Sequence, residues 1–173
     1  DEYLAKFAKL MRLILENSEK KEVALSEDLK ALELYMQLES LRMNQKFTYK
    51  VKVDEAIDAE NTLIPPLILQ PFVENSIWHG ISKKEGAGNI LVHIKKEGEM
   101  INCIVEDDGI GRKMAAIQTE GSKPIQKQSL GMKITEARIN ILNKVKNSTA
   151  DIQLFDLAEG TRVEVKLPLE LSF

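Results

Sequence analysis

Apolar residues recur along the first part of the chain at the spacing of an α-helix. Between residues 4 and 18 they return every three or four positions, and mostly charged residues stand between them. This pattern predicts an amphipathic helix. A second helix is predicted from Ser26, its expected N-cap, to about Met43. Its apolar stripe is broad, so we expect other elements to cover it on more than one side.

Five later segments carry the pattern of strands, and most of them alternate apolar and polar residues as a strand with one buried face does. They span residues 47–53, 89–95, 100–107, 151–155 and 161–167. The short Glu97-Gly98-Glu99 turn predicts that the second and third segments form a hairpin. Gly160 marks the turn between the last two.

Two further helices are predicted between and after these strands. Pro65 and Pro66 mark the start of a helix that should run to about Gly80, because proline is tolerated in a first turn. Another helix is predicted to follow Gly131, with an apolar face formed by Ile134, Ala137, Ile141, Leu142 and Val145. Residues 112–130 are polar, and we expect much of this stretch to be a mobile loop.

Helices that are segregated from hairpin strands predict an α+β fold. We expect a two-layer sandwich, with helices on one face of a mixed, mostly antiparallel sheet. The chain has 173 residues, of which 43% are hydrophobic, which suits one compact domain with a small appendage.

Charge and cysteine content exclude several classes of protein. The 24 basic and 27 acidic residues give a net charge of -3, so we expect no nucleic-acid binding. The single cysteine forms no internal disulfide, which favours a reducing compartment. No apolar run approaches the roughly 18 residues of a membrane span. The sequence begins at Asp1 without an initiator methionine, and we expect membrane or sensor parts of a longer protein to be missing.

Asn75 is the first residue with candidate chemistry. On the predicted helix, Glu74, Asn75, Trp78 and His79 lie around the side away from the sheet, so Asn75 can face a cleft. An amide oxygen suits Mg²⁺, which usually keeps several waters and shares its other sites with nucleotide phosphates. The alternative interpretation is an ordinary surface asparagine.

Asp107 is the second candidate. It is in phase with Cys103 and Val105 on the buried face of its strand, and a buried carboxylate needs hydrogen-bond donors. An adenine amino group is one possible donor, since Gly109 and Gly111 let the backbone approach a ring closely. The alternative is an aspartate that begins a glycine turn at a strand end.

Backbone amides and cations near residue 131 could accommodate phosphate. Gly131 stands before a predicted helix, whose N-terminal amides favour anions. Cations in the preceding stretch could neutralise a phosphate, although a solvated charged loop is the default interpretation. These cations are Arg112, Lys113, Lys123 and Lys127.

The motifs resemble those of sensor histidine kinases of the LytS/YehU type. The segment Ile64-Pro-Pro-Leu-Ile-Leu-Gln-Pro-Phe-Val-Glu-Asn-Ser-Ile-Trp-His-Gly80 is similar to their IPPLxLQPxVENAxxHG motif. The resemblance extends to Leu25-Ser-Glu-Asp-Leu29, Tyr35, Glu39-Ser-Leu-Arg42, Asp107-Asp-Gly-Ile-Gly111, Leu130-Gly-Met-Lys-Ile-Thr-Glu-Ala-Arg-Ile139 and Gly160-Thr-Arg-Val-Glu-Val-Lys-Leu-Pro168. It implies the ATP-binding (Bergerat) fold shared with DNA gyrase, heat-shock protein 90 and MutL.

The resemblance also implies a role for each site residue. Asn75 would ligate Mg²⁺, with Glu74 beside it near the waters of the metal, and Asp107 would bind the adenine amine. His79 would lie near the base or the phosphates. The remaining residues expected to contact ATP are Trp78, Gly109, Gly111, Gly131, Met132 and Thr161.

Three departures from the family pattern refine this expectation. Trp78 stands where a basic residue is common, and Ser129 and Met132 alter the usual GxGL pattern. Pro71 replaces the glutamate that activates water in hydrolysing relatives, which favours transfer to a protein over ATP hydrolysis. The acceptor histidine of this family lies in an HFxFN segment, and the histidines here are only His79 and His93. We therefore expect this chain to bind ATP without phosphorylating itself.

The sequence-based hypothesis is thus a histidine kinase catalytic domain at residues 23–173, preceded at 1–22 by a remnant of the dimerisation and phosphotransfer helices. The expected partners are ATP, a response regulator receiver domain and, in the full-length protein, a second copy. We expect the cytoplasmic domain of an inner-membrane sensor, attached to the membrane only through upstream segments. The alternatives are a catalytically silent nucleotide-binding or dimerisation module, and an ATPase of the gyrase or MutL type.

Overall fold

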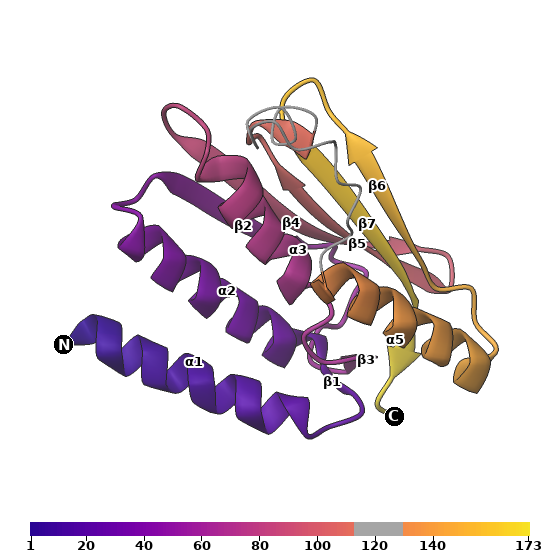
Figure 1. Ribbon diagram of the computed structural model, residues 1–173. Coiled ribbons are helices and arrows are strands. Elements are labelled where there is room, and N and C mark those ends of the chain that lie inside the picture. The colour runs from indigo at the N-terminus through magenta and orange to yellow at the C-terminus, as the bar shows by residue number, and fades with distance from the viewer. Residues whose placement is uncertain (113–129) are drawn as a thin grey trace.

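The computed structural model describes residues 1–112 and 130–173, and its helices form one layer (Figure 1). The α-helices are α1 (Glu2–Ser18), α2 (Leu25–Arg42), α3 (Gln70–Asn75) and α5 (Leu130–Lys146). A π-helical segment, η1 (Ser76–Ile81), continues directly from α3. Within the described residues, no helix is long and apolar enough to cross a membrane.

The second layer is a sheet that contains all five predicted strands. Within the described residues, its strand order is β2 (Phe47–Val53), β4 (Gly88–Glu97), β5 (Met100–Asp107), β7 (Thr161–Pro168) and β6 (Asp151–Asp156). β2 pairs parallel to β4, and the other neighbours are antiparallel. A small antiparallel sheet joins β1 (Val23–Ala24), β3 (Thr62–Ile64) and β8 (Glu170–Leu171).

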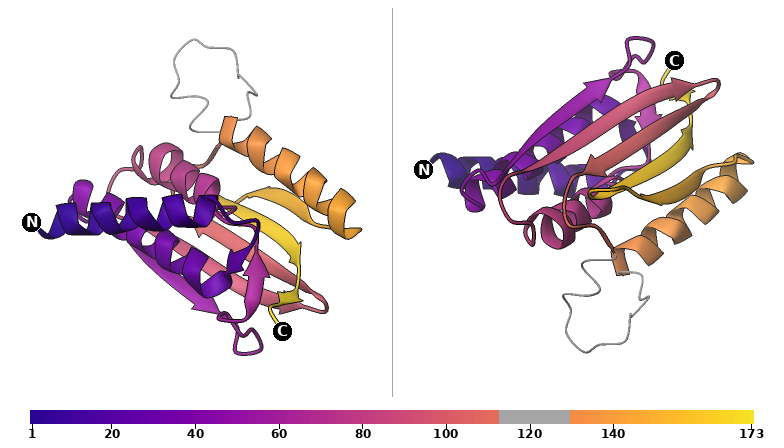
Figure 2. Two further views of the ribbon diagram at one scale, coloured as in Figure 1. Left: turned by 90° about the horizontal axis from the view of Figure 1, so that it is seen from below. Right: turned by 90° about the horizontal axis from the view of Figure 1, so that it is seen from above.

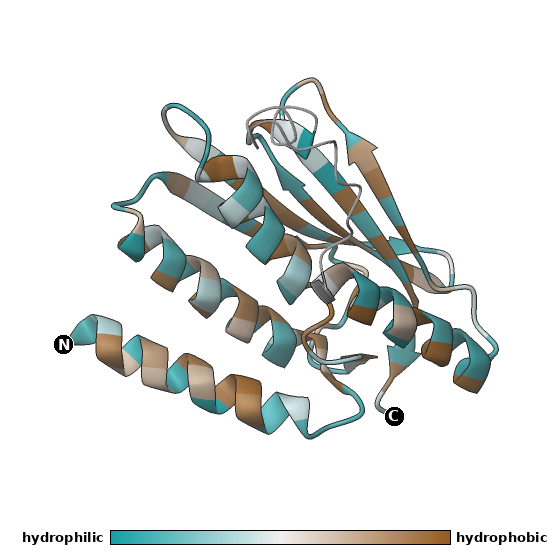
Figure 3. Ribbon diagram, in the orientation of Figure 1, coloured by the Kyte–Doolittle hydropathy of each residue, from teal (hydrophilic) through white to brown (hydrophobic). Residues whose placement is uncertain are grey.

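α2, α3 with η1, and α5 cover one face of the main sheet, and the core lies between the two layers (Figure 2). The alternation of β4 and β5 places the side chains of Ile90, Val92, Cys103 and Val105 in this core. Apolar positions also recur along the helices that face them (Figure 3). The predicted α+β sandwich with a mixed, mostly antiparallel sheet is therefore confirmed.

The helix predicted from Pro66 begins four residues later, at Gln70. Leu67 has a positive φ of 59°, which is incompatible with a right-handed helical turn. Its N–H instead donates to the Asp28 carboxylate of α2 at 2.8 Å. Pro71 takes the place in the first turn that was predicted for Pro66.

Ser26 is not the N-cap of α2, because the helix begins at Leu25 and Ala24 occupies the cap position. No side chain caps this end. The Ser26 N–H instead donates to the Ala59 carbonyl at 2.9 Å, so a tertiary contact satisfies a donor that a capping side chain would otherwise serve.

The predicted buried face of α5 is mostly wrong. Ile134, Ile141 and Val145 are 52%, 61% and 75% exposed, and Ala137 is exposed as well. The buried side chains are instead those of Met132, Thr135 and Ile139, with Leu142 partly buried beside them. Both sets recur at helical spacing, so the period alone does not select between them. Gly131 also lies within the first turn of this helix and not before it.

α1 packs on α2 outside the main core. Leu10 is buried against Ala31 and Leu38, whereas Leu4, Phe7, Met11 and Leu15 remain exposed. We call these four residues the α1 apolar stripe.

The predicted loop at residues 112–130 lies largely outside the described residues, as do Lys113, Lys123, Lys127 and Ser129. Arg112 is described, and its guanidinium forms two hydrogen bonds with the Asp156 carboxylate, at 2.9 and 3.0 Å. Its charge is therefore already paired.

Candidate functional site

Asp107 is the buried centre of the candidate site. It ends β5 and is only 5% exposed. The Ser76 hydroxyl donates to its Oδ2 at 2.8 Å, and the Gly109 N–H donates to its Oδ1 at 2.9 Å. Burial raises the pKa of Asp107 in spite of these donors. A carboxylate has about four lone-pair sites, so two donors leave acceptor capacity for a further ligand.

Glycines bring three backbone segments together around this carboxylate. A Cβ at Gly109 would lie 2.4 Å from the Gly80 carbonyl carbon, and one at Gly80 would lie 2.9 Å from the Asp107 Oδ1. A Cβ at Gly160, where φ is +88°, would lie 1.8 Å from the Asp107 carbonyl oxygen. Only glycine permits these close approaches.

Ser76, Gly80 and Gly160 were not predicted as site residues. Ser76 lies on the apolar face of its helix, and it is buried there with Phe72, Val73 and Ile77. A hydroxyl on an otherwise apolar face needs a buried polar partner, and this signal could have identified the contact with Asp107.

Asn75 ends α3 and is partly buried. Within the described residues its side chain has no hydrogen-bond partner. Glu74, Trp78 and His79 are exposed, as predicted for this side of the helix. Among residues 1–112 and 130–173 no side chain or backbone group occupies this amide, which lies one residue before Ser76.

Two other elements bring predicted residues towards Asp107. Thr161 begins β7 and pairs with Asp107 across the sheet. Gly111, with a φ of +80°, follows two residues after Gly109. Gly131 and Met132 lie in the first turn of α5, and this helix contacts α3. The Met132 side chain is buried in the core, so it cannot point freely towards a ligand.

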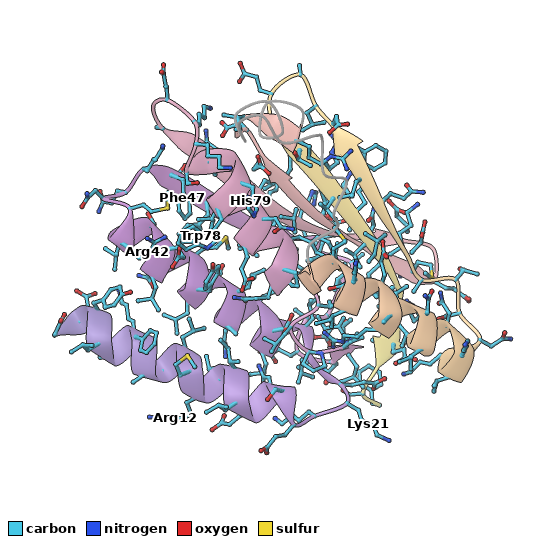
Figure 4. The ribbon with its side chains drawn as sticks, in the orientation of Figure 1. Arg12, Lys21, Arg42, Phe47, Trp78 and His79 are labelled. Atoms are coloured by element: carbon cyan, nitrogen blue, oxygen red, sulfur yellow. The ribbon has the colours of Figure 1, made fainter. Side chains whose placement is uncertain are left out.

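Trp78 contacts α2. The Arg42 guanidinium lies 4.4 Å from the centre of the Trp78 ring, within the range of a cation–π interaction (Figure 4). Glu39 holds this guanidinium at 2.8 and 3.3 Å. Burial raises the pKa of the Tyr35 hydroxyl on α2, and Trp78 partly opposes that rise. The structure therefore places the Trp78 side chain on the α2 side of η1.

Asp108, the next residue in the chain, has a different environment. Its carboxylate accepts hydrogen bonds from the backbone N–H and side-chain amide of Asn89, at 2.7 and 2.8 Å. Lys84 lies 3.5 Å away. Asp108 borders an open groove of about 500 Å³ that Asp107 also lines, whereas Asn75 does not. These contacts assign Asp108 to holding β4 against the end of β5.

The donor set is compatible with one kind of metal site. Among residues 1–112 and 130–173, no group of three or more His, Cys, Asp or Glu could hold a metal ion. Asn75 offers a single oxygen. Such a site suits Mg²⁺, which takes most of its ligands from phosphates and water when it binds with a nucleotide.

Comparison with known proteins gives consistent matches. The histidine kinase family model matches residues 1–47. Over 168 residues the chain is 28% identical to the sensor protein LytS of Oceanobacillus iheyensis. This match covers 95% of this chain and 28% of that protein. Over 171 residues it is 26% identical to the sensor histidine kinase/phosphatase LytS of Staphylococcus aureus, covering 98% of this chain and 29% of that protein.

A solved structure shares the fold. The histidine kinase domain of the blue-light activated histidine kinase from Erythrobacter litoralis matches with a TM-score of 0.58 and 17% identity, covering 96% of this chain and 75% of that one. The chain spans less than a third of the length of the two LytS relatives. The predicted resemblance to LytS-type sensor histidine kinases is thus confirmed.

Proposed function

We propose that this chain, which is similar to the LytS sensor histidine kinases and has the fold of a histidine kinase domain, binds Mg²⁺-ATP. It would transfer the γ-phosphate to a histidine outside residues 1–173, for relay to a response regulator. The observation that carries the proposal is the Asp107 carboxylate, buried between Ser76 and a glycine cradle, with Asn75 next to Ser76 in the chain.

Asp107 would select the base. Its two present donors leave lone pairs that can accept an N–H of the adenine amino group. Guanine and hypoxanthine carry a carbonyl oxygen at that position, and two acceptors facing each other in a buried site repel. ATP should therefore bind more tightly than GTP or ITP.

Asn75 and the start of α5 would hold the phosphates. The Asn75 oxygen would ligate Mg²⁺, and Glu74 and His79 would lie close to the metal's waters and the phosphates. The amides in the first turn of α5, around Gly131, would favour the same anion. Bound Mg²⁺ would neutralise charge on the phosphates, and the contribution of the protein would be to position the donor for in-line attack.

Pro71 supports transfer over hydrolysis. It lies in the first turn of α3, where ATP-hydrolysing relatives are expected to carry the glutamate that activates water. Proline has no ionisable group, so this position cannot supply a general base.

The α1 apolar stripe supports association with a second copy of the chain. Leu4, Phe7, Met11 and Leu15 lie exposed on a helix that packs on α2 through its other side. A second copy of the chain would cover this stripe, as expected if residues 1–22 belong to a dimerisation and phosphotransfer region and residues 23–173 to the catalytic domain. The whole protein would be a membrane sensor, with this part in the cytoplasm.

Calorimetric titration with Mg²⁺-ATP tests the site. Asn75→Ala and Asp107→Asn should abolish measurable binding, whereas Asp151→Asn, an exposed carboxylate at the start of β6, should leave it unchanged. Unimpaired binding by both site variants would contradict the proposed site.

Transfer is tested separately with a second polypeptide that carries an HFxFN helix. Labelled phosphate should pass from ATP to that histidine. Binding without transfer would favour the silent module, and steady phosphate release without an acceptor would favour an ATPase of the gyrase or MutL type.

A further inference from the structure

Three segments singled out in the sequence meet at one buried polar junction. Asp28 comes from α2, Pro66 and Leu67 from the turn before α3, and Arg138 from α5. Asp28 is 3% exposed and accepts the Leu67 N–H at 2.8 Å. The Arg138 guanidinium donates to the Pro66 carbonyl oxygen at 2.6 Å. The proposed chemistry at Asn75 and Asp107 does not use any of these residues.

The turn at this junction is strained and leads directly to the site. Leu67 holds a φ of +59° although it is not glycine, and such a conformation persists only where surrounding contacts impose it. The helix that carries Asn75 starts three residues later, at Gln70. The path of this short helix therefore depends on the conformation of residues 66–69.

Arg138 connects the same turn to the other side of the site. It lies seven residues, or about two helical turns, after Gly131 in α5. Its side chain is partly buried, and its charge favours the ionised form of the neighbouring Asp28. The buried apolar contacts of α5 come from Met132 and Ile139, and such contacts are non-directional. The bond to Pro66 is directional and defines one position.

We propose that Arg138 is a positioning residue of the nucleotide site: it fixes the start of α5 relative to the turn that leads into Asn75. The inference rests on the proposed function, because it assigns the two sides of an ATP site to α3 and α5. Displacement of either helix by about 1 Å would misalign the phosphates with their ligands.

The first experiment measures Mg²⁺-ATP affinity by calorimetry. Arg138→Met keeps most of the side-chain volume but removes the donor, and it should weaken binding by about ten- to a hundredfold. Arg138→Lys retains one donor and should give an intermediate loss. Lys144→Met, which removes an exposed cation from the same helix, should bind as the wild type does.

The second experiment measures the spacing of the helices directly. Spin labels at Lys83→Cys, just beyond η1, and at Asn140→Cys, on the exposed side of α5, report a distance by pulsed electron resonance while Cys103 stays buried and unlabelled. The distance distribution should broaden or shift in Arg138→Met and not in Lys144→Met. A purely stabilising role would lower the melting temperature without changing this distribution or the affinity of the folded protein.

The outcomes separate the two proposals. Wild-type affinity or an unchanged distance distribution in folded Arg138→Met overturns the role of Arg138. If Arg138→Met does not fold, the same criteria apply to Arg138→Lys. Absence of Mg²⁺-ATP binding by the wild-type chain overturns the proposed function, while the distance measurement still tests whether Arg138 positions α5.

Discussion

Asp107 and Asp108 are neighbours in the sequence, yet their side chains have opposite surroundings. Burial raises the pKa of Asp107, and the Ser76 and Gly109 donors only partly offset it. Burial also acts on Asp108, but the two Asn89 donors and Lys84 outweigh it and lower the pKa. A raised pKa alone does not identify a site, because Asp28 is also buried with a raised pKa; the glycine cradle around Asp107 is what distinguishes it.

Asp107→Asn should separate stability from binding. The folded state raises the pKa of Asp107, so it favours the protonated form, and the stability from this group is lost as pH rises through that pKa. Asparagine remains neutral, its oxygen can accept from the Gly109 N–H, and its amide can donate to the Ser76 hydroxyl. The variant should therefore equal or exceed the wild type in unfolding free energy at pH 7.5, although it loses ATP binding.

Urea unfolding at pH 4 and pH 7.5 checks this, with Asp108→Asn as the control. That control replaces one of the two oxygens that accept from Asn89 with an amide donor and removes the charge that faces Lys84, so it should be less stable than the wild type. A marked loss of stability in Asp107→Asn at pH 7.5 would contradict the prediction.

Asp28 should give the fold a distinct pH dependence. Burial raises its pKa to about 6, from an ordinary value near 4. The stability that it contributes is complete below about pH 4 and is lost as pH rises towards pH 6 and above. Asp28→Asn keeps an acceptor for the Leu67 N–H but has no charge to ionise. The variant should be more stable than the wild type at pH 8, by on the order of 2 kcal/mol, and the difference should vanish near pH 4.

Urea titrations at pH 4, 6 and 8 measure this difference. Parallel stability curves for the two proteins across that range would show that ionisation of Asp28 does not limit stability.

At the scale of elements, α5 carries two apolar stripes of similar period. One contains Met132 and Ile139, and the other contains Ile134, Ile141 and Val145. Thr135 lies on the stripe that is buried, which is possible because its hydroxyl donates to the Gly131 carbonyl at 2.8 Å. Packing against α3 and the sheet, together with the Arg138 bond, decides which stripe faces inward.

A matched pair of substitutions tests this orientation. Ile139 is 5% exposed and Ile141 is 61% exposed on the same helix. Ile139→Ala should lower the free energy of unfolding by about 2–4 kcal/mol, because it removes buried methyl groups and leaves a cavity. Ile141→Ala should change it by less than about 0.5 kcal/mol. Equal losses in urea unfolding, or a larger loss for Ile141→Ala, would mean that the other stripe is buried.

The contact between η1 and the end of β5 also belongs to this scale. Gly80 and Gly109 approach so closely that the Ile110 N–H reaches the Gly80 carbonyl at 3.3 Å. This contact places Ser76 opposite Asp107. π-Helical segments are rare in proteins, and those that occur often lie at functional sites. The position of η1 beside Asp107 is consistent with this tendency.

At the scale of the whole molecule, the exposed α1 apolar stripe is the feature that a second copy would cover. Lys146 pairs with both Glu22 and Glu170, which ties the link after α1 to the end of the chain. These ion pairs therefore fix the segment that connects α1 to the rest of the domain.

Introducing charge into this stripe should prevent association. The double substitution Leu4→Glu and Leu15→Glu should shift the mass at high concentration from that of a dimer to that of one chain, because burying two carboxylates is unfavourable. Light scattering after size-exclusion chromatography measures this mass, and Arg12→Glu, an exposed charge change on the same helix, should have little effect. Equal masses for the wild type and the double variant would contradict a dimer through α1.

The sequence alone determined the strands, the class of fold, the outward side of the Asn75 helix and the burial of Asp107. Each of these depends on the side chains of a single element, whose period shows which positions are apolar. The motifs that resemble those of LytS-type sensor histidine kinases could also be read from the sequence alone.

Only the tertiary structure decided which of two apolar stripes on α5 is buried, where the Asn75 helix begins, and what holds Asp107. Leu67 departs from helical geometry because Asp28, 39 residues earlier, accepts its N–H. Ser76 meets Asp107 across 31 residues, and Trp78 meets Arg42 on another helix. These outcomes depend on contacts between elements, and local periodicity does not encode them because several faces of one helix can satisfy the same pattern.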